Sequence, residues 1–277
     1  MQNEATKLKG VILCADDFAV HEPASHGIAL LAAMGRLSAT SVMVLSPRWA
    51  DDVALLQSLR GHMDVGLHLD WTSEFALAAG HGLSLGAAML KSALGGFNQQ
   101  AAREVIERQL DAFETHWKAP PDYVDGHQHV QQFAGIREAL VQALVRRYGA
   151  RPSQKPYLRI SRAPAGAADL KSRVIAAMGA SALEMIAAGA GITGATALLG
   201  AYDFAGDTAG YARRMDGWLA QAPAGSILMC HPAREQVPGD AIGAARAREF
   251  AYLSSADFPT ALARTGVQLV RGVRPPR

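Results

Sequence analysis

Short apolar runs alternate along the whole chain with longer stretches in which apolar residues recur at helical spacing. The predicted strands cover residues 11–15, 40–45, 65–69, 123–125, 157–160, 226–230 and 267–270, with a weaker apolar piece at 196–199. The predicted helices cover about 23–35, 49–56, 106–117, 136–149, 167–188, 211–220, 244–253 and 258–263. This rhythm is typical of a parallel sheet covered by helices.

Neither a break in composition nor an internal repeat divides the chain. We therefore predict one domain over residues 1–277, a single-domain α/β fold of the (β/α) barrel-like type with seven or eight mostly parallel strands. Residues 1–9 and 271–277 are predicted to be flexible ends. The glycine-punctuated segment 73–100 is predicted to be a lid or binding loop. The apolar stretch 174–199 contains Glu184 and is predicted to be a soluble helix rather than a membrane span.

Composition excludes some classes of protein. Apolar residues make up 49% and charged residues 19% of the chain, which is ordinary for a globular protein. The 27 basic and 25 acidic residues are scattered and give a net charge of +2, so we expect no nucleic-acid partner. Two cysteines are too few for a disulfide framework, and the first nine residues hold no apolar leader, so we expect a cytoplasmic protein.

Three predicted strands run directly into residues that bind metals or move protons. The first leads into Asp16 and Asp17, the third into His68, and the fourth into His127. The carboxyl ends of parallel strands meet at one edge of a sheet, so we expect these side chains to converge on one site. Carboxylates and imidazoles are common ligands of divalent metals.

Asp16 and Asp17 are neighbours, and neighbours on an extended strand point to opposite faces. Both can serve one site only if the strand ends there. One carboxylate could then bind a cation while the other accepts a proton from the attacking water. The alternative is a helix N-terminus that attracts two acidic residues, but Pro23 indicates that the helix begins several residues later.

The histidines allow both structural and functional interpretations. His68 could be a buried histidine bonded to a backbone carbonyl, but its place at a strand end favours a ligand, with Asp70 orienting a histidine or binding substrate. In the His-x-His segment we predict that His127 is a ligand and that His129 lines the substrate site, on the same side if the backbone is extended.

A fourth histidine, His231, follows the strand at 226–230. A histidine across the pocket from a metal could protonate a leaving amine, whereas the alternative is a loop or capping residue. Arg159 and Arg162, at and after the fifth strand, could orient a carboxylate or bind substrate oxygens, although surface arginines occupy similar positions. The remaining histidines lack comparable context, and neither a dinucleotide nor a Walker motif is present.

Four segments together resemble the YdjC-like family of carbohydrate deacetylases. They are Ala15-Asp16-Asp17-Phe18, Val65-Gly66-Leu67-His68-Leu69, Asp125-Gly126-His127-Gln128-His129-Val130 and Met229-Cys230-His231-Pro232. They follow the family's order over most of the chain, and the third is most similar to the hopanoid-biosynthesis-associated (HpnK) branch. The chain departs from the family's usual residues at Gln131, where a third histidine is common, and at Ala233, where glycine is common.

The resemblance implies a metal-dependent hydrolase with a barrel-like fold. Asp17, His68 and His127 would hold a divalent ion such as Zn²⁺ or Mg²⁺, Asp16 would be the base, and His231 the acid. A metal-bound water would attack the acetyl group of an N-acetylated amino sugar, either a free carbohydrate or a hopanoid glycolipid. The implied partners are this substrate, a membrane surface contacted peripherally, and a second copy in a homodimer.

Two alternatives remain at this stage. Another metal-dependent hydrolase, such as a phosphoesterase on a related barrel, would use the same ligand types. A non-catalytic sugar or lipid binder is the second alternative, but it would need neither Asp16 as a base nor His231 as an acid.

Overall fold

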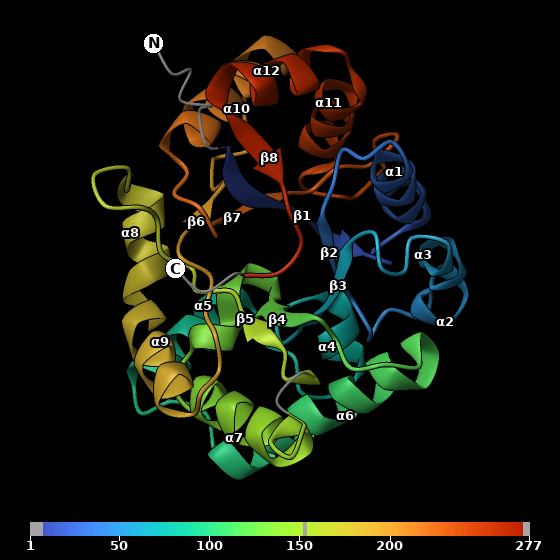
Figure 1. The fold of residues 1–277 in the computed structure, drawn as a ribbon. Helices are drawn as coiled ribbons and strands as arrows, with labels where there is room; N and C mark the ends of the chain where they lie inside the picture. The colour runs from blue at the N-terminus through green and yellow to red at the C-terminus, as the bar shows by residue number, and fades with distance from the viewer. Residues whose placement is uncertain (1–7, 152–153, 274–277) are drawn as a thin grey trace.

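The computed structural model describes residues 8–151 and 154–273. Its eight strands form one sheet in the order β5-β4-β3-β2-β1-β7-β6, with β8 beside the start of β1, and every pair is parallel (Figure 1). The strands are β1 (Lys9–Phe18), β2 (Ala39–Val42), β3 (Asp64–Leu69), β4 (Tyr123–Gly126), β5 (Tyr157–Leu158), β6 (Leu198–Leu199), β7 (Ile227–Cys230) and β8 (Val267–Leu269).

The sheet curls into a barrel-like form. At its edge, the backbone N–H of Leu158 in β5 donates to Thr193 O at 2.9 Å, and the N–H of Ala195 donates to Leu158 O at 2.9 Å. These bonds connect β5 to the segment that leads into β6. The structure therefore confirms the predicted single α/β domain with a barrel-like parallel sheet.

Helices surround the strands (Figure 1). They are α1 (Glu22–Ala33), α2 (Trp49–Asp52), α3 (Ala54–Gln57), α4 (Glu74–Ala78), α5 (Leu85–Ala93), α6 (Gln99–Trp117), the 3₁₀ helix η1 (His127–Gln132), α7 (Ile136–Tyr148), α8 (Leu170–Ala177), α9 (Ala180–Gly189), α10 (Thr208–Gln221), α11 (Gly243–Ser254) and α12 (Asp257–Thr265). Among the residues that the structure describes, it contains no helix long and apolar enough to cross a membrane.

Some predicted boundaries are wrong. The segment 73–100 is not a plain loop, because Ser73 and Ser84 accept hydrogen bonds from backbone N–H groups and cap α4 and α5. The predicted helix 167–188 is two helices, which are separated at Gly179, whose φ is +127°.

The predicted flexible ends are partly anchored where the structure describes them. Lys9 is the first residue of β1, and its N–H donates to Gly266 O at 2.8 Å. The Nε of Arg271 lies 3.1 Å from Asp64 Oδ1. Residues 1–7 and 274–277 of the predicted ends lie outside the described part of the chain.

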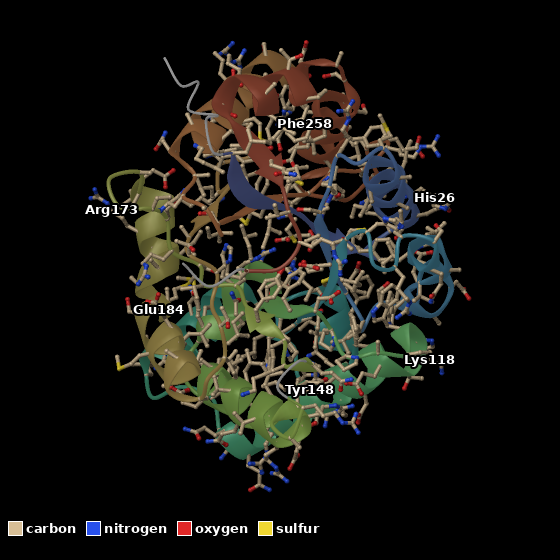
Figure 2. All side chains as sticks on the ribbon, in the orientation of Figure 1. His26, Lys118, Tyr148, Arg173, Glu184 and Phe258 are labelled. Carbon is tan, nitrogen blue, oxygen red and sulfur yellow. The ribbon has the colours of Figure 1, made fainter. Side chains whose placement is uncertain are left out.

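Two apolar clusters follow from the alternation of side chains along the strands. Val11 and Leu13 of β1 belong to the large cluster that contacts the helices, whereas Ile12 and Cys14 belong to a smaller one that also contains Tyr123. Side chains fill the space between the strands and the helices (Figure 2). The smaller cluster therefore occupies the inside of the curled sheet, below the strand ends.

Gly66 in β3 lies against this inner cluster. A Cβ atom at Gly66 would lie 2.5 Å from ring carbons of Tyr123, whose hydroxyl is 2.8 Å from Cys14 Sγ and whose ring stacks on Tyr157. The tyrosine ring cannot shift without breaking these contacts, so only glycine fits at this position.

Exchange of Gly66 for alanine is expected to lower the free energy of unfolding by about 1–3 kcal/mol, because the added methyl group overpacks the inner cluster. Denaturant unfolding followed by circular dichroism measures this change. The control is Gly86→Ala in α5, where nothing lies within 4 Å of the added Cβ. Equal stability of the two variants would contradict the steric assignment.

Candidate active site

Alternation along β1, β3, β4 and β5 carries polar residues to one end of the inner cluster. Each apolar or small residue that faces inward is followed two positions later by a charged or imidazole side chain. The pairs are Cys14 and Asp16, Gly66 and His68, Tyr123 and Asp125, and Tyr157 and Arg159. The four polar side chains are buried and contact one another, so the strand period alone brings them together.

Asp17 joins this group because the strand backbone changes there. The register between β1 and β2 shifts between Ala15 and Phe18, and Asp17 has a φ of 66°. A left-handed conformation is uncommon for a residue with a side chain, although aspartate tolerates it better than most. The irregular backbone allows the neighbouring carboxylates of Asp16 and Asp17 to serve one site.

Asp17, His68 and His127 form a compact group of ligand atoms. Asp17 Oδ1 lies 3.4 Å from His68 Nε2 and 3.2 Å from His127 Nδ1, and the three potential ligand atoms all lie within 4.8 Å of one another. Asp17 and His68 are buried, and His127 is partly exposed. One carboxylate oxygen and two imidazole nitrogens are compatible with a divalent metal ion.

Asp125 orients His68. The Nδ1 of His68 lies 2.6 Å from Asp125 Oδ1, so a proton on Nδ1 is donated to this carboxylate, while Nε2 faces Asp17. Burial lowers the pKa of His68, but the charge and hydrogen bond of Asp125, with the Asp17 contact, raise it to about 10. The sequence pattern did not predict this role of Asp125, although it lies only two residues before His127.

Asp70, which we expected near a histidine or the substrate, has a different position. Its Oδ1 accepts hydrogen bonds from the N–H groups of Thr72 and Ser73, both at 3.0 Å, and its Oδ2 accepts one from the Ser73 hydroxyl. The side chain is completely buried. Asp70 therefore shapes the turn that precedes α4, because these polar groups need a buried acceptor.

Arg159 connects Asp16 to Asp125. Its NH1 and NH2 lie 2.6 Å from the two oxygens of Asp16, and NH2 also lies 2.6 Å from Asp125 Oδ2. The side chain has no exposed surface, so the guanidinium orients protein carboxylates rather than facing the solvent side of the site. Arg162 pairs instead with Glu184 at 2.7 Å, and Figure 2 places Glu184 at the outer edge of the molecule.

The arginines keep both aspartates ionised. Burial alone would raise the pKa of each carboxyl. The charge of Arg159 lowers the pKa of Asp16 well below its usual range, and Arg246, together with His127 and His68, does the same for Asp17. Arg246 NH2 lies 2.7 Å from Asp17 Oδ2.

His231 lies on the other side of Asp16. Its Nε2 is 3.9 Å from Asp16 Oδ2, and its ring meets the ring of Phe204 edge-on at 5.3 Å between centroids. Its backbone N–H donates to Glu249 Oε2 at 2.6 Å. The His231 imidazole therefore lies near the carboxylate of Asp16, the residue next to Asp17 in the chain.

His129 does not share an extended backbone with His127. Gln128 and His129 have φ values of 52° and 64°, within η1, and the ring of His129 reaches Ser161 Oγ at 3.1 Å. Burial, followed by the charge of Arg159, lowers the pKa of His129 to about 3, so its ring is neutral. Gln131 donates to Ser161 Oγ and to Arg159 O, which fixes the end of β5.

A second group of potential ligands, Cys14, Asp16 and Asp125, lies deeper. It does not fit a metal ion, because the guanidinium of Arg159 already lies 3.0 Å from Cys14 Sγ and 2.6 Å from each carboxylate. This cation supplies the positive charge that a metal would bring.

Comparison with known proteins identifies the family. Residues 10–264 match the sequence model of the YdjC-like protein family. The chain belongs to this family. A human protein named carbohydrate deacetylase is 25% identical to this YdjC-like chain over an alignment of 292 positions. The alignment covers 94% of the chain and 88% of the human protein.

Solved structures with similar folds show the same architecture. A structure from Enterococcus faecalis V583, described as a proposed cellobiose-phosphate cleavage protein, superposes with a TM-score of 0.69 at 19% identity and covers 95% of this chain and 97% of its own. The Xyl-CE4 domain of a multidomain xylanase from the hindgut metagenome of Trinervitermes trinervoides gives 0.51 at 9% identity, with coverages of 95% and 87%. At these identities the similarity concerns the fold.

Exchange of Asp125 for asparagine is expected to weaken Zn²⁺ binding by about 10–100-fold, because the orientation and basicity of His68 depend on this carboxylate. Competition with a chromophoric chelator measures the dissociation constant. Asp122→Asn, just before β4, is the matched control. Unchanged Zn²⁺ affinity in a folded Asp125→Asn variant would contradict the assignment.

Metal binding is expected to release about one proton from His68 near neutral pH. The ion-free ring has a pKa of about 10, so below that pH a metal must displace the proton on Nε2, and affinity should rise with pH. Calorimetric titration in buffers of different ionisation enthalpy counts the released protons. Affinity that stays constant between about pH 7 and 9 would argue against this protonation state.

Proposed function

We propose that this YdjC-like protein is a metal-dependent hydrolase that removes the acetyl group from an N-acetylated amino sugar. Two kinds of observation support this proposal. The family and the human carbohydrate deacetylase point to the substrate class. The observation that carries the reaction type is the cluster of Asp17, His68 and His127 beside Asp16 and His231.

In this proposal Asp17, His68 and His127 hold the ion. A divalent ion in such a site supplies positive charge that polarises a carbonyl and lowers the pKa of water. The two proton transfers of the reaction would then be carried out by Asp16 and His231, which do not bind the ion.

Asp16 is proposed to be the general base. Its carboxylate is held by two 2.6 Å contacts with Arg159, and its Oδ2 is the oxygen nearest His231. An ionised carboxylate in a fixed position can accept a proton from the attacking water during the reaction. The low pKa of Asp16 keeps this group available as an acceptor over the whole neutral range.

His231 is proposed to be the general acid. Its Nε2 faces the space next to Asp16, where it could protonate the departing nitrogen of the amide. Glu249 fixes the backbone of His231 through the 2.6 Å bond to its N–H, and Phe204 packs against its ring. These contacts restrict where the imidazole can lie. The products would be acetate and a free amino sugar.

The finer substrate proposal follows from the similarity to the hopanoid-associated branch. An amino sugar linked to a hopanoid lipid would place a large apolar group outside the polar site, and such a substrate would involve peripheral contact with a membrane. Exposed apolar side chains on α8 and α9, including Leu170 and Met185, offer contact area for it. A homodimer is a separate proposal, which sedimentation analysis would test.

A direct comparison tests the substrate class. Acetate release is measured from N-acetylglucosamine oligomers and from an N-acetylglucosamine glycolipid, each with Zn²⁺ and with Mg²⁺. Faster release from the glycolipid supports the lipid-linked substrate, whereas equal rates support a free carbohydrate. Phosphate release from a sugar phosphate without acetate release from either substrate would favour a metal-dependent phosphoesterase instead.

Replacement of Asp16 by asparagine, or of His231 by asparagine, is expected to lower kcat by about 10²–10⁴-fold with little change in Zn²⁺ affinity, because proton transfer is lost while the ligands remain. Acetate release and metal titration provide the two readouts. Asp51→Asn and His62→Asn, both exposed, are the matched controls. Full turnover by either site variant would exclude its proposed role.

A further inference from the structure

The two oxygens of Asp17 have different partners. Oδ1 faces His68 and His127, whereas Oδ2 lies 2.7 Å from NH2 of Arg246. Both side chains of this ion pair are buried. The guanidinium thus occupies the oxygen that Asp17 would need in order to bind an ion with both atoms of its carboxylate.

Arg246 is itself held from three sides. Its Nε lies 2.7 Å from Asp240 Oδ2, and its NH1 lies 3.5 Å from the carbonyl oxygen of His231. Asp240 Oδ2 is also 3.2 Å from Nε2 of His21. The Nδ1 of His21 accepts a hydrogen bond from Ala24 N–H, so its Nε2 carries the proton and donates to Asp240.

Arg246 belongs to α11, and none of the motifs identified in the sequence lies on this helix. Arg246 and Glu249 are three residues apart on this helix and both are buried. Arg246 contacts Asp17 and the His231 carbonyl, while Glu249 accepts from the His231 N–H. One helix face therefore fixes a proposed ligand and the proposed acid together.

We propose that Arg246 is a positioning residue that restricts Asp17 to one-oxygen metal ligation and weakens the site's affinity for oxygen-preferring cations. This inference rests on the proposed function, because it concerns the same metal group. The guanidinium repels an incoming dication and withholds a hard oxygen donor. Mn²⁺ and Mg²⁺, which favour oxygen ligands, lose more from this than Zn²⁺, which readily takes two imidazoles and one carboxylate oxygen.

Removal of the charge tests the proposal. In Arg246→Met we expect the dissociation constant for Mn²⁺ to fall by about tenfold, with a smaller change for Zn²⁺, because repulsion is removed and Asp17 gains a free oxygen. Arg246→Lys keeps the charge and should bind Mn²⁺ like the unmodified protein, but with lower kcat, since lysine lacks the planar fork that reaches Asp240 and Asp17.

The control is Arg248→Met. Arg248 lies on the same helix, but its side chain donates to the carbonyl oxygens of Phe204 and Ala244 and not to Asp17. This variant should leave both dissociation constants unchanged. If Arg246→Met fails to fold, Arg246→Gln carries the test, because glutamine removes the charge and keeps an N–H donor for Asp17.

Competition with a chromophoric chelator measures affinity for Mn²⁺ and Zn²⁺ in each folded variant. Unchanged or weaker Mn²⁺ binding in both neutral variants, or an equal change for both metals, would overturn the inference. A different result bears on the proposed function instead: if the unmodified protein bound neither metal at this site, the metal-dependent mechanism would fail before Arg246 was tested.

Discussion

Two adjacent carboxylates, Asp16 and Asp17, are buried at the end of β1, and each needs a positive partner. Burial of an unpaired charge is strongly unfavourable, so each aspartate is matched by an arginine from a distant part of the chain. Arg159 pairs with Asp16, and Arg246 pairs with Asp17. The left-handed backbone at Asp17 makes this double arrangement feasible within one strand end.

The remaining charges follow from this constraint. Asp125 adds a third buried carboxylate, which shares Arg159 with Asp16 and is also 2.6 Å from His68. With Asp240 on Arg246, four carboxylates contact the two guanidinium groups, and the charge of Asp125 raises the pKa of His68 so that its imidazole keeps a balancing proton at neutral pH. A divalent ion in contact with Asp17, His68 and His127 would supply that positive charge in place of the proton. The excess of carboxylates over guanidinium groups therefore explains both the raised pKa of His68 and the suitability of the site for a metal ion.

Much of the fold and the grouping of the candidate metal ligands was predictable from local pattern. The apolar runs predict where each strand ends, and the carboxyl ends of parallel strands meet at one edge of the sheet. These two facts were enough to predict that Asp17, His68 and His127 lie together. Helix breaks were less predictable, since Gly179 interrupts an apolar stretch without an obvious stop. Segment 73–100 was predicted as a loop because its glycines obscured the serine caps that begin α4 and α5.

The supporting residues were harder to find because their partners are distant in sequence. Arg246 lies 229 positions from Asp17, and only the packing of α11 against the strand ends brings the two together. Asp70 has the right residue type two positions after His68, but β3 ends at Leu69, so Asp70 lies beyond the strand and accepts the N–H groups of the turn before α4. Asp125 instead reaches His68 from the next strand.

Anomalous diffraction from crystals loaded with Zn²⁺ would locate the ion relative to the strand ends. We expect one strong peak at a bonding distance of about 2.0–2.2 Å from Asp17 Oδ1 and from one nitrogen each of His68 and His127. Asp16 and His231 should flank the ion without binding it. A peak elsewhere, with these three side chains unligated, would show that they do not form the metal site.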